Sequence, residues 1–240
     1  DASVFRLQGE SGTRLGESLS LTDVDGDGLD DVIVGASRDG PGGVFVFFSG
    51  SGMRGELTVE DADVVLRPPT GLSRVGGAIA VGDVDGDGHL DIAAGAADSM
   101  DGAASGGGFM VVRGPIEAGV MTAASADVRL GSFPAGQLGA QVVAIDLEGD
   151  GVDEMAVSSP GADGIEASAG RVEIFDVRLD LPGGALVTLA GESEGSRFGV
   201  ALAGGDVDGL GVSGLAVGAV GVRTLGSRTG AVGVAGRRVG

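Results

Sequence analysis

Clusters of aspartate recur along the chain with a spacing that suits a hard divalent cation. The first runs from Asp23 to Asp31 and carries carboxylates at its positions 1, 3, 5 and 9. Alternate residues of a tight loop point inward, so these carboxylates and the position-7 carbonyl can surround one ion. Ca²⁺ accepts about 6–8 oxygens in a tolerant geometry, whereas Mg²⁺ demands a stricter octahedron. The loop therefore predicts a calcium site.

The same loop returns three more times with graded losses. The second, 83–91, fills the same positions with Asp, and the third, 146–154, has Glu at positions 3 and 9. The fourth begins at Asp206 and has lost the carboxylates of positions 5 and 9. We expect about three calcium sites and a fourth loop that is empty or very weak. None of these is an EF-hand, because position 12 is not Glu and no helices flank the loop.

The loops are landmarks of a repeat of about 60 residues. Successive loops begin 60, 63 and 60 residues apart, and a residue pair ending in Gly repeats with the same steps: Leu15-Gly16, Val75-Gly76, Leu138-Gly139 and Phe198-Gly199. Each repeat divides into short apolar runs whose lengths suit strands and not helices. Four strands in about 60 residues is the size of a propeller blade with long loops.

We therefore expect one all-β domain over 1–240, with four-stranded antiparallel blades at approximately 8–67, 68–130, 131–190 and 191–240 plus 1–7. The first residues, 1–7, are similar to the last strands of the second and third repeats, and the fourth repeat stops after its third strand. The N-terminal strand is thus expected to complete the last blade, which would remove two exposed sheet edges.

The composition excludes several classes of protein. The net charge of −20 and the absence of Trp and Tyr argue against nucleic-acid binding. The absence of Cys excludes disulfides and thiolate metal sites. No apolar run reaches the roughly 18 residues that a membrane span needs. Without Cys, and with His89 as the one histidine, the chain offers no catalytic set, so we expect a protein that is not an enzyme.

The landmarks together resemble FG-GAP repeats, which occur in the β-propeller of integrin α subunits and in many bacterial surface proteins. Phe198-Gly199 matches the FG element literally. The GAP element is found as Gly35-Ala36-Ser37, Gly95-Ala96-Ala97 and Gly218-Ala219-Val220, and is replaced by Ser158-Ser159-Pro160 in the third repeat. Integrin-type propellers have seven blades, whereas this chain holds four repeats.

The resemblance implies that calcium sits in the loop joining the first two strands of a blade, on the face away from the ligand. Carried over to this sequence, the metal ligands are Asp23, Asp25, Asp27, Leu29 (carbonyl) and Asp31; Asp83, Asp85, Asp87, His89 (carbonyl) and Asp91; and Asp146, Glu148, Asp150, Val152 (carbonyl) and Glu154. In this arrangement the calcium stiffens long loops; the other possibility is that it bridges to a ligand.

The resemblance also implies a non-catalytic adhesion or binding module for a protein or glycan, in an extracellular, cell-surface or periplasmic location. Two alternatives stay open: a structural assembly element, as half of a larger or homodimeric propeller, or an accessory domain of a secreted hydrolase. Candidate contact regions are the loops 98–107 and 161–169. A further candidate is the ring of polar residues at one repeat position, which are otherwise loop hydrogen-bond donors: Arg14, Arg74, Gln137 and Arg197.

Overall fold

The computed structural model describes residues 5–51, 53–99, 106–122, 126–130, 136–179, 184–207, 209, 211–224 and 227–235. Within this part of the chain the regular structure consists of β-strands and three-residue 3-10 turns, so the expected all-β class is confirmed. In the same residues, no helix has the length and apolar character needed to cross a membrane.

Four sheets of three to five strands follow one another along the described chain, and a fifth sheet pairs two short strands. The first contains β2 (Leu15–Thr22), β3 (Asp31–Ala36), β4 (Val44–Phe47), β6 (Val64–Arg67) and β10 (Gly119–Thr122). The second contains β7 (Ala78–Gly82), β8 (Asp91–Gly95), β9 (Gly108–Val112) and β11 (Ala126–Leu130). The third contains β12 (Val142–Ile145), β13 (Glu154–Ser159), β14 (Arg171–Phe175) and β15 (Val187–Ala190). The fourth contains β16 (Ala201–Gly205), β17 (Gly214–Thr224) and β18 (Ser227–Ala235).

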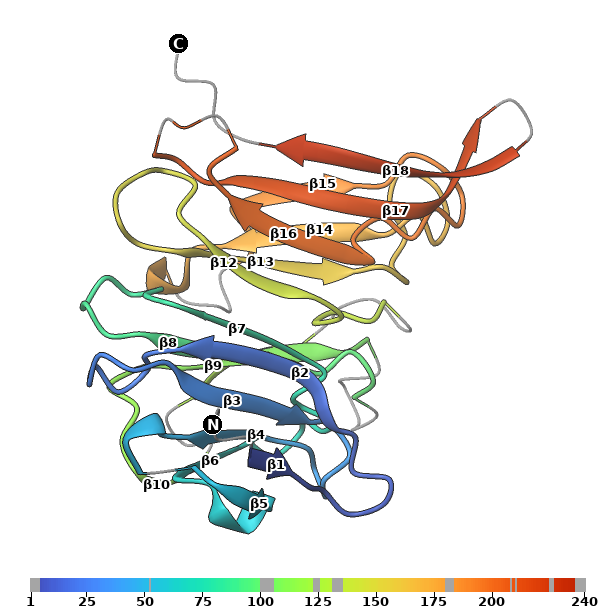
Figure 1. Cartoon of the computed structure of the whole chain (residues 1–240). Helices are drawn as coiled ribbons and strands as arrows, with labels where there is room; N and C mark the ends of the chain where they lie inside the picture. The colour runs from blue at the N-terminus through green and yellow to red at the C-terminus, as the bar shows by residue number, and fades with distance from the viewer. Residues whose placement is uncertain are drawn as a thin grey trace.

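The sheets stack face to face in chain order, from the N-terminal sheet to the C-terminal sheet (Figure 1). The first strands of the repeats lie side by side, since β7 contacts β2 and β12, and β12 contacts β16. Strands of the middle sheets are buried on both faces, as in β8, β9 and β13. This explains why their sequences are continuous small or apolar runs and not an alternation of apolar and polar residues.

Three apolar layers between the sheets form the core. Ile33, Val46 and Leu66 of the first sheet pack with Ile92 and Met110 of the second. The next layer joins the second and third sheets, where the rings of Phe109 and Phe175 lie 5.4 Å apart. A smaller layer, including Ile174 and Leu215, joins the third and fourth sheets.

The residue pairs ending in Gly connect each sheet to the one before it. Val75 accepts a hydrogen bond of 2.9 Å from the N–H of Gly43, and Leu138 accepts an equivalent bond from Gly108. Gly76 has φ of +101°, and a Cβ added to it would overlap the carbonyl oxygen of Gly43. Glycine is therefore required here both by the left-handed backbone and by the close approach of the preceding sheet.

The expectation that the N-terminal strand completes the last blade is wrong. Strand β1 (Phe5–Leu7) instead pairs in parallel with β5 (Gly55–Leu57) beside the first sheet. Leu7 and Leu57 both pack against the apolar cluster that includes Phe45 and Phe47, on the face of the first sheet that has no preceding sheet to cover it. Covering that apolar face provides the physical reason for the pairing.

The second repeat also contributes to the first sheet. Strand β10 pairs in parallel with β6, so the first sheet has five strands. The repeat range 68–130 therefore does not coincide with one sheet, because its residues 119–122 extend the sheet of 8–67. Strand β11 occupies the expected place as the outer strand of the second sheet, next to β9.

Candidate metal centre

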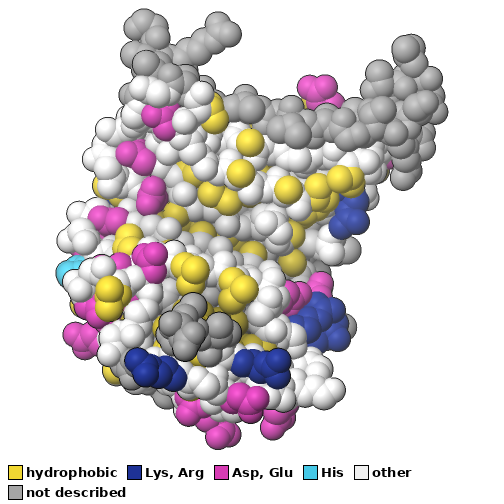
Figure 2. Space-filling view, viewed as in Figure 1, with side chains coloured by type: hydrophobic (Ala, Val, Ile, Leu, Met, Phe, Trp, Pro, Cys, Tyr) yellow, Lys and Arg dark blue, Asp and Glu magenta, His cyan; other side chains and the backbone are white. Residues whose placement is uncertain are grey.

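The four acidic loops lie along one edge of the stack. Each joins the first two strands of its repeat: β2 to β3, β7 to β8, β12 to β13 and β16 to β17. Because successive sheets stack in the same orientation, these connections follow one another at the left of Figure 1. Figure 2 shows acidic side chains and the single histidine gathered along the same edge.

In the first loop, backbone N–H groups hold the carboxylates in place. Asp23 accepts hydrogen bonds from Gly26 at 2.8 Å and Gly28 at 2.9 Å, one on each oxygen. Asp25 and Asp27 each accept one N–H from two residues further on, at 3.0 and 2.8 Å. Asp23, Asp25 and Asp27 then present oxygens that lie within 4.8 Å of one another. A carboxylate oxygen that accepts one N–H retains a lone pair for a cation.

The second loop repeats this arrangement with one difference. Asp83 again accepts two N–H groups, from Gly86 at 2.7 Å and Gly88 at 2.9 Å. Here the oxygens that come within 4.8 Å belong to Asp83, Asp85 and the buried Asp91. Asp87 accepts the N–H of His89 at 2.8 Å and lies outside this group.

The carboxylate at position 9 is buried and binds two separate parts of its repeat. Asp31 is 0% exposed and accepts N–H groups from Val24 at 3.0 Å and Ser49 at 2.9 Å. Asp91 is 1% exposed and accepts the equivalent bonds from Val84 at 2.8 Å and Gly114 at 2.7 Å. Position 9 therefore fixes the acidic loop to the end of the third strand, a structural role that the loop spacing alone did not reveal.

The third loop differs because an arginine lies against two of its carboxylates. Asp146 accepts N–H groups from Gly149 and Gly151 as in the other loops. Arg178, however, lies 3.3 Å from Asp150 and 3.9 Å from Glu154, and among the described residues no group of three carboxylates converges in this loop. Glu148 is exposed.

The fourth loop keeps the position-1 turn although its carboxylates at positions 5 and 9 are lost. Asp206 accepts hydrogen bonds from Gly209 at 2.7 Å and Gly211 at 2.9 Å, as position 1 does in every other loop. Positions 3 and 5, residues 208 and 210, lie outside the described residues. The loop conformation at position 1 thus depends on Asp and the two glycines and not on a full set of acids.

Crowding and burial make several of these carboxylates harder to ionise. Burial, with repulsion from Asp85 and Asp83, raises the pKa of Asp91 above its ordinary value, although hydrogen bonds from Gly114 and Val84 oppose the shift. Burial also raises the pKa of Glu154, again with neighbouring acids contributing. The pKa of Asp25 is raised by desolvation first and then by the other acids of its loop. A bound cation would remove this repulsion.

Neighbouring loops also contact one another. The N–H of Asp153 donates to the carbonyl of Asp83 at 2.8 Å, and the N–H of Ser213 donates to the carbonyl of Asp146 at 2.9 Å. The second loop also borders a hollow of about 380 Å³ that Arg113 and Arg178 help to line. Arg113 lies 3.3 Å from Asp85 and donates to the carbonyl of Val177. Ordering one loop should therefore help to order the next.

The first two loops fit a calcium ion. Their converging donors are all carboxylate oxygens, the kind that Ca²⁺ prefers, and backbone N–H groups orient them before any ion binds. The position-7 residues Leu29, His89 and Val152 each donate their N–H to the position-5 carboxylate. This bond restrains the residue whose carbonyl was expected to bind the metal, through its N–H.

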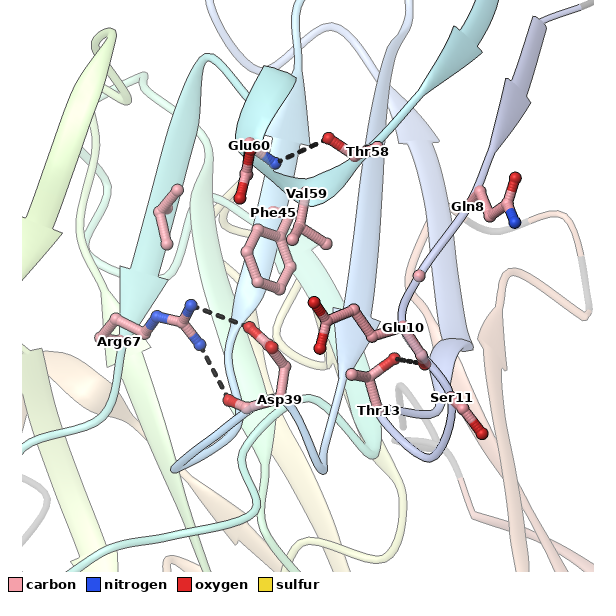
Figure 3. Close-up of a pocket in the computed structure, with 12 residues that line it drawn as sticks. Gln8, Glu10, Ser11, Thr13, Asp39, Phe45, Thr58, Val59, Glu60 and Arg67 are labelled. Carbon is pink, nitrogen blue, oxygen red and sulfur yellow. Dashed lines mark hydrogen bonds and ion pairs between the residues drawn. The ribbon is translucent and has the colours of Figure 1, made fainter.

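A second candidate site lies on the outer face of the first sheet, which the repeat pattern gave no reason to expect. It is a hollow of about 1120 Å³ between residues 8–13, β4, β6 and the 3-10 turn Val59–Asp61. Arg67 pairs with Asp39 at 2.8 Å and its guanidinium lies 5.1 Å from the centre of the Phe45 ring. Glu10 points into the hollow near this pair (Figure 3).

The ring of polar residues proposed from the sequence marks a special backbone position. Arg14, Arg74, Gln137 and Arg197 all have positive φ, between 51° and 62°. They precede the residue pairs that join the sheets, so their shared feature is the turn they form. Among the proposed contact loops, residues 100–105 of loop 98–107 lie outside the described residues. In loop 161–169, Ile165 is 69% exposed and its N–H is held by the carbonyl of Gly191.

Comparison with known proteins agrees with this repeat structure. Residues 23–94, which include the first two acidic loops, match the FG-GAP-like repeat family. A segment of 100 residues is 39% identical to integrin alpha-PS5 of Drosophila melanogaster, and it covers 40% of this chain and 10% of that protein. FG-GAP-like repeats on stacked, small antiparallel sheets make this an all-β fold of the β-propeller type, and the chain carries FG-GAP-like repeats similar to those of an integrin α subunit.

Proposed function

We propose that the chain is a calcium-stabilised, non-catalytic binding or adhesion module of an extracellular, cell-surface or periplasmic protein. The observation that carries the proposal is the pair of carboxylate clusters at the same place in two successive repeats. An adhesion role is supported by the similarity to an integrin α subunit. A location outside the cytoplasm agrees with loops of this type, many of which require the higher calcium concentrations found there.

Calcium in this proposal has a structural role. It would bind to Asp23, Asp25 and Asp27 in the first loop and to Asp83, Asp85 and Asp91 in the second. The ion supplies positive charge that offsets the crowding of carboxylates, and by binding only the folded state it adds to stability. The proposal that the chain is not an enzyme rests on its composition, because the one histidine, His89, belongs to the second acidic loop.

Calorimetric titration with calcium tests this assignment. The wild-type chain should release or absorb heat with a defined stoichiometry, and the double variant Asp25→Asn, Asp85→Asn should bind much more weakly. The double variant Asp98→Asn, Glu60→Gln is the matched control, since it also removes two charges, from exposed residues outside the acidic loops. Equal binding by all three proteins would rule out the acidic loops as the calcium sites.

The ligand-binding surface is proposed at the edge opposite the acidic loops. Antiparallel strands place the β3–β4 turn, with Asp39, and the loop 161–169 at that edge, and Ile165 is exposed there. Loops positioned by a rigid scaffold often carry binding residues. The proposed ligand is a protein, with a glycan as the other class.

Binding to a panel of purified surface proteins and to a glycan array would test this surface. We expect a protein ligand whose binding is reduced at least tenfold by Ile165→Asp and unchanged by Leu186→Asp, which alters an exposed residue at the opposite edge, outside the acidic loops. Loss of binding with Leu186→Asp alone would place the ligand at the acidic edge instead. Binding only to glycans would replace the protein ligand in the proposal.

A structural assembly role is the second candidate, and exposed leucines on β2 favour it. Leu19 and Leu21 are 65% and 69% exposed, and they pair across the strands with Val34 and Val32 on the outer face of the first sheet. A further sheet from a second copy, or from a longer propeller, could cover them. Light scattering distinguishes the cases, since a monomer has a mass of 23.3 kDa.

A further inference from the structure

We infer that the guanidinium of Arg178 takes the place of a calcium ion in the third acidic loop, so that calcium binds to the first and second loops only. The inference rests on the proposed calcium binding and deepens it, because it predicts which of the similar loops take the ion. From its sequence the third loop was expected to be a calcium site like the first two.

The guanidinium of Arg178 reaches three carboxylates at once. Its Nη1 lies 3.3 Å from Asp150 Oδ2 and its Nη2 lies 3.9 Å from Glu154 Oε1. Asp150 and Glu154 are positions 5 and 9 of the loop, two of the four places that would hold the metal. Its Nε and Nη2 also bind Asp176, at 2.9 and 3.0 Å.

Asp176 fixes the orientation of the Arg178 side chain. The two side chains form a bidentate pair, and the N–H of Arg178 donates to the same carboxylate at 2.9 Å. Bidentate guanidinium–carboxylate pairs are strong and geometrically specific. Arg178 itself lies in the 3-10 turn Val177–Leu179. Its positive charge is therefore held beside Asp150 and Glu154.

In each of these two carboxylates, one oxygen accepts a backbone N–H and the other oxygen faces Arg178. Asp150 Oδ1 accepts the N–H of Val152 and its Oδ2 faces Arg178. Glu154 Oε2 accepts the N–H of Leu147 and its Oε1 faces Arg178. A calcium ion at this place would lie next to a fixed guanidinium, and the two like charges would repel each other.

The same place in the first and second repeats carries no cation. Cross-strand pairing aligns Phe47, Val112 and Phe175, so Gly50 and Pro115 occupy the position equivalent to Arg178. A Cβ on Gly50 would lie 3.0 Å from Asp27 Oδ2, which shows that this position also faces the position-5 carboxylate in the first repeat. In the second repeat, Arg113 contacts one loop carboxylate, Asp85, and the three-carboxylate cluster is kept.

Equilibrium dialysis against calcium, with metal analysis of the full chain, counts the sites. We expect two ions per wild-type chain and three per chain for Arg178→Gln, which removes the charge and keeps much of the side chain. Arg171→Gln is the matched control: it removes the same charge from the far end of β14, where Arg171 contacts the carbonyl of Asp163. It should bind two. Far-UV circular dichroism verifies that each variant is folded.

The outcomes separate the two proposals. Three ions on the wild-type chain, or two on folded Arg178→Gln, would overturn the role of Arg178 and leave calcium binding by the first two loops intact. Fewer than two ions on the wild-type chain would overturn the calcium assignment itself.

The converse substitution tests the same idea without disturbing the third loop. Gly50→Arg places a guanidinium beside Asp27, and Gly50→Gln adds a neutral side chain of similar length. We expect one ion on Gly50→Arg and two on Gly50→Gln. Two ions on both would show that a guanidinium at this position does not displace calcium, which would overturn the inference.

Discussion

Asp91 accepts a hydrogen bond of 2.7 Å from the backbone N–H of Gly114, which lies 23 residues later in the chain. The bond connects the last position of an acidic loop to the end of the third strand of the same repeat. Asp31 makes the equivalent bond to Ser49. The position-9 carboxylate therefore has two roles: it belongs to the loop that presents oxygens to a cation, and it holds the repeat together without one.

Asp91→Asn should destabilise the protein even when calcium is absent. The side chain is 1% exposed and accepts two backbone N–H groups, so an amide that cannot accept on both sides leaves one N–H without a partner. We expect a loss of about 1–3 kcal/mol in the free energy of unfolding, measured by urea denaturation in EDTA. Asp87→Asn, at the exposed position 5 and outside the converging carboxylates, is the control and should leave the stability in EDTA nearly unchanged.

The glycines of the repeated residue pairs should contribute differently to stability, depending on whether a preceding sheet packs against them. Gly76→Ala introduces a Cβ that overlaps Gly43 and places it on a left-handed residue, so we expect a loss of about 3 kcal/mol or more. Gly16→Ala has the same left-handed backbone but nothing within 4 Å, and should cost only about 1–2 kcal/mol. Equal losses in chemical denaturation would contradict the role of Gly76 in joining the sheets.

Without calcium, stability should rise as the pH falls from 7 toward 4.5. The folded-state pKa values of Asp91, Asp153 and Glu154 are raised above their ordinary values, with burial as the first cause. A raised pKa stabilises the folded protein below the unfolded pKa, near 4, and this contribution is lost as the pH rises through the folded pKa. Melting in EDTA measures the trend.

Calcium should reverse this pH dependence. Protons compete with the ion for the same carboxylates, so saturating calcium should raise the melting temperature more at pH 7 than at pH 4.5. The same melting series, repeated in calcium, provides the comparison. A melting temperature in EDTA that falls steadily with acidification would show that the pKa values of these carboxylates are not raised in the folded, metal-free protein.

Arg113→Gln should strengthen calcium binding by the second loop. The guanidinium lies 3.3 Å from Asp85, and its removal takes away a positive charge that competes with the ion. Removal of about 0.7–1.4 kcal/mol of repulsion corresponds to an affinity gain of about threefold to tenfold, measured by calorimetric titration. Arg67→Gln, in the outer hollow, removes the same charge without contact to the loop and should leave the affinity unchanged.

The repeat structure could be predicted from the sequence because it depends on local signals. The acidic loops and the pairs such as Val75-Gly76 mark strand ends, and the continuous apolar runs of β8 and β13 correspond to strands buried on both faces. The position of each loop between its first two strands follows directly from the order of these signals.

The parts that could not be predicted depend on contacts between distant segments. The first strand resembles other outer strands, but its partner is decided by the uncovered apolar face near Phe45, which is not visible in a linear pattern. Likewise, Arg178 stands 24 residues after Glu154, and only the pairing of β13 with β14 brings it to the third loop. Loop spacing alone could not distinguish this loop from its neighbours.

Thermal melting by far-UV circular dichroism, in calcium and in EDTA, tests the central claim most directly. At calcium concentrations 100-fold above Kd, each site adds about 2.7 kcal/mol, and each kcal/mol raises the melting temperature of a chain of this size by about 2–4 °C. Two sites should therefore raise it by about 10 °C or more, and magnesium should restore less of the loss after chelation. An unchanged melting temperature would contradict a structural role for calcium in the acidic loops.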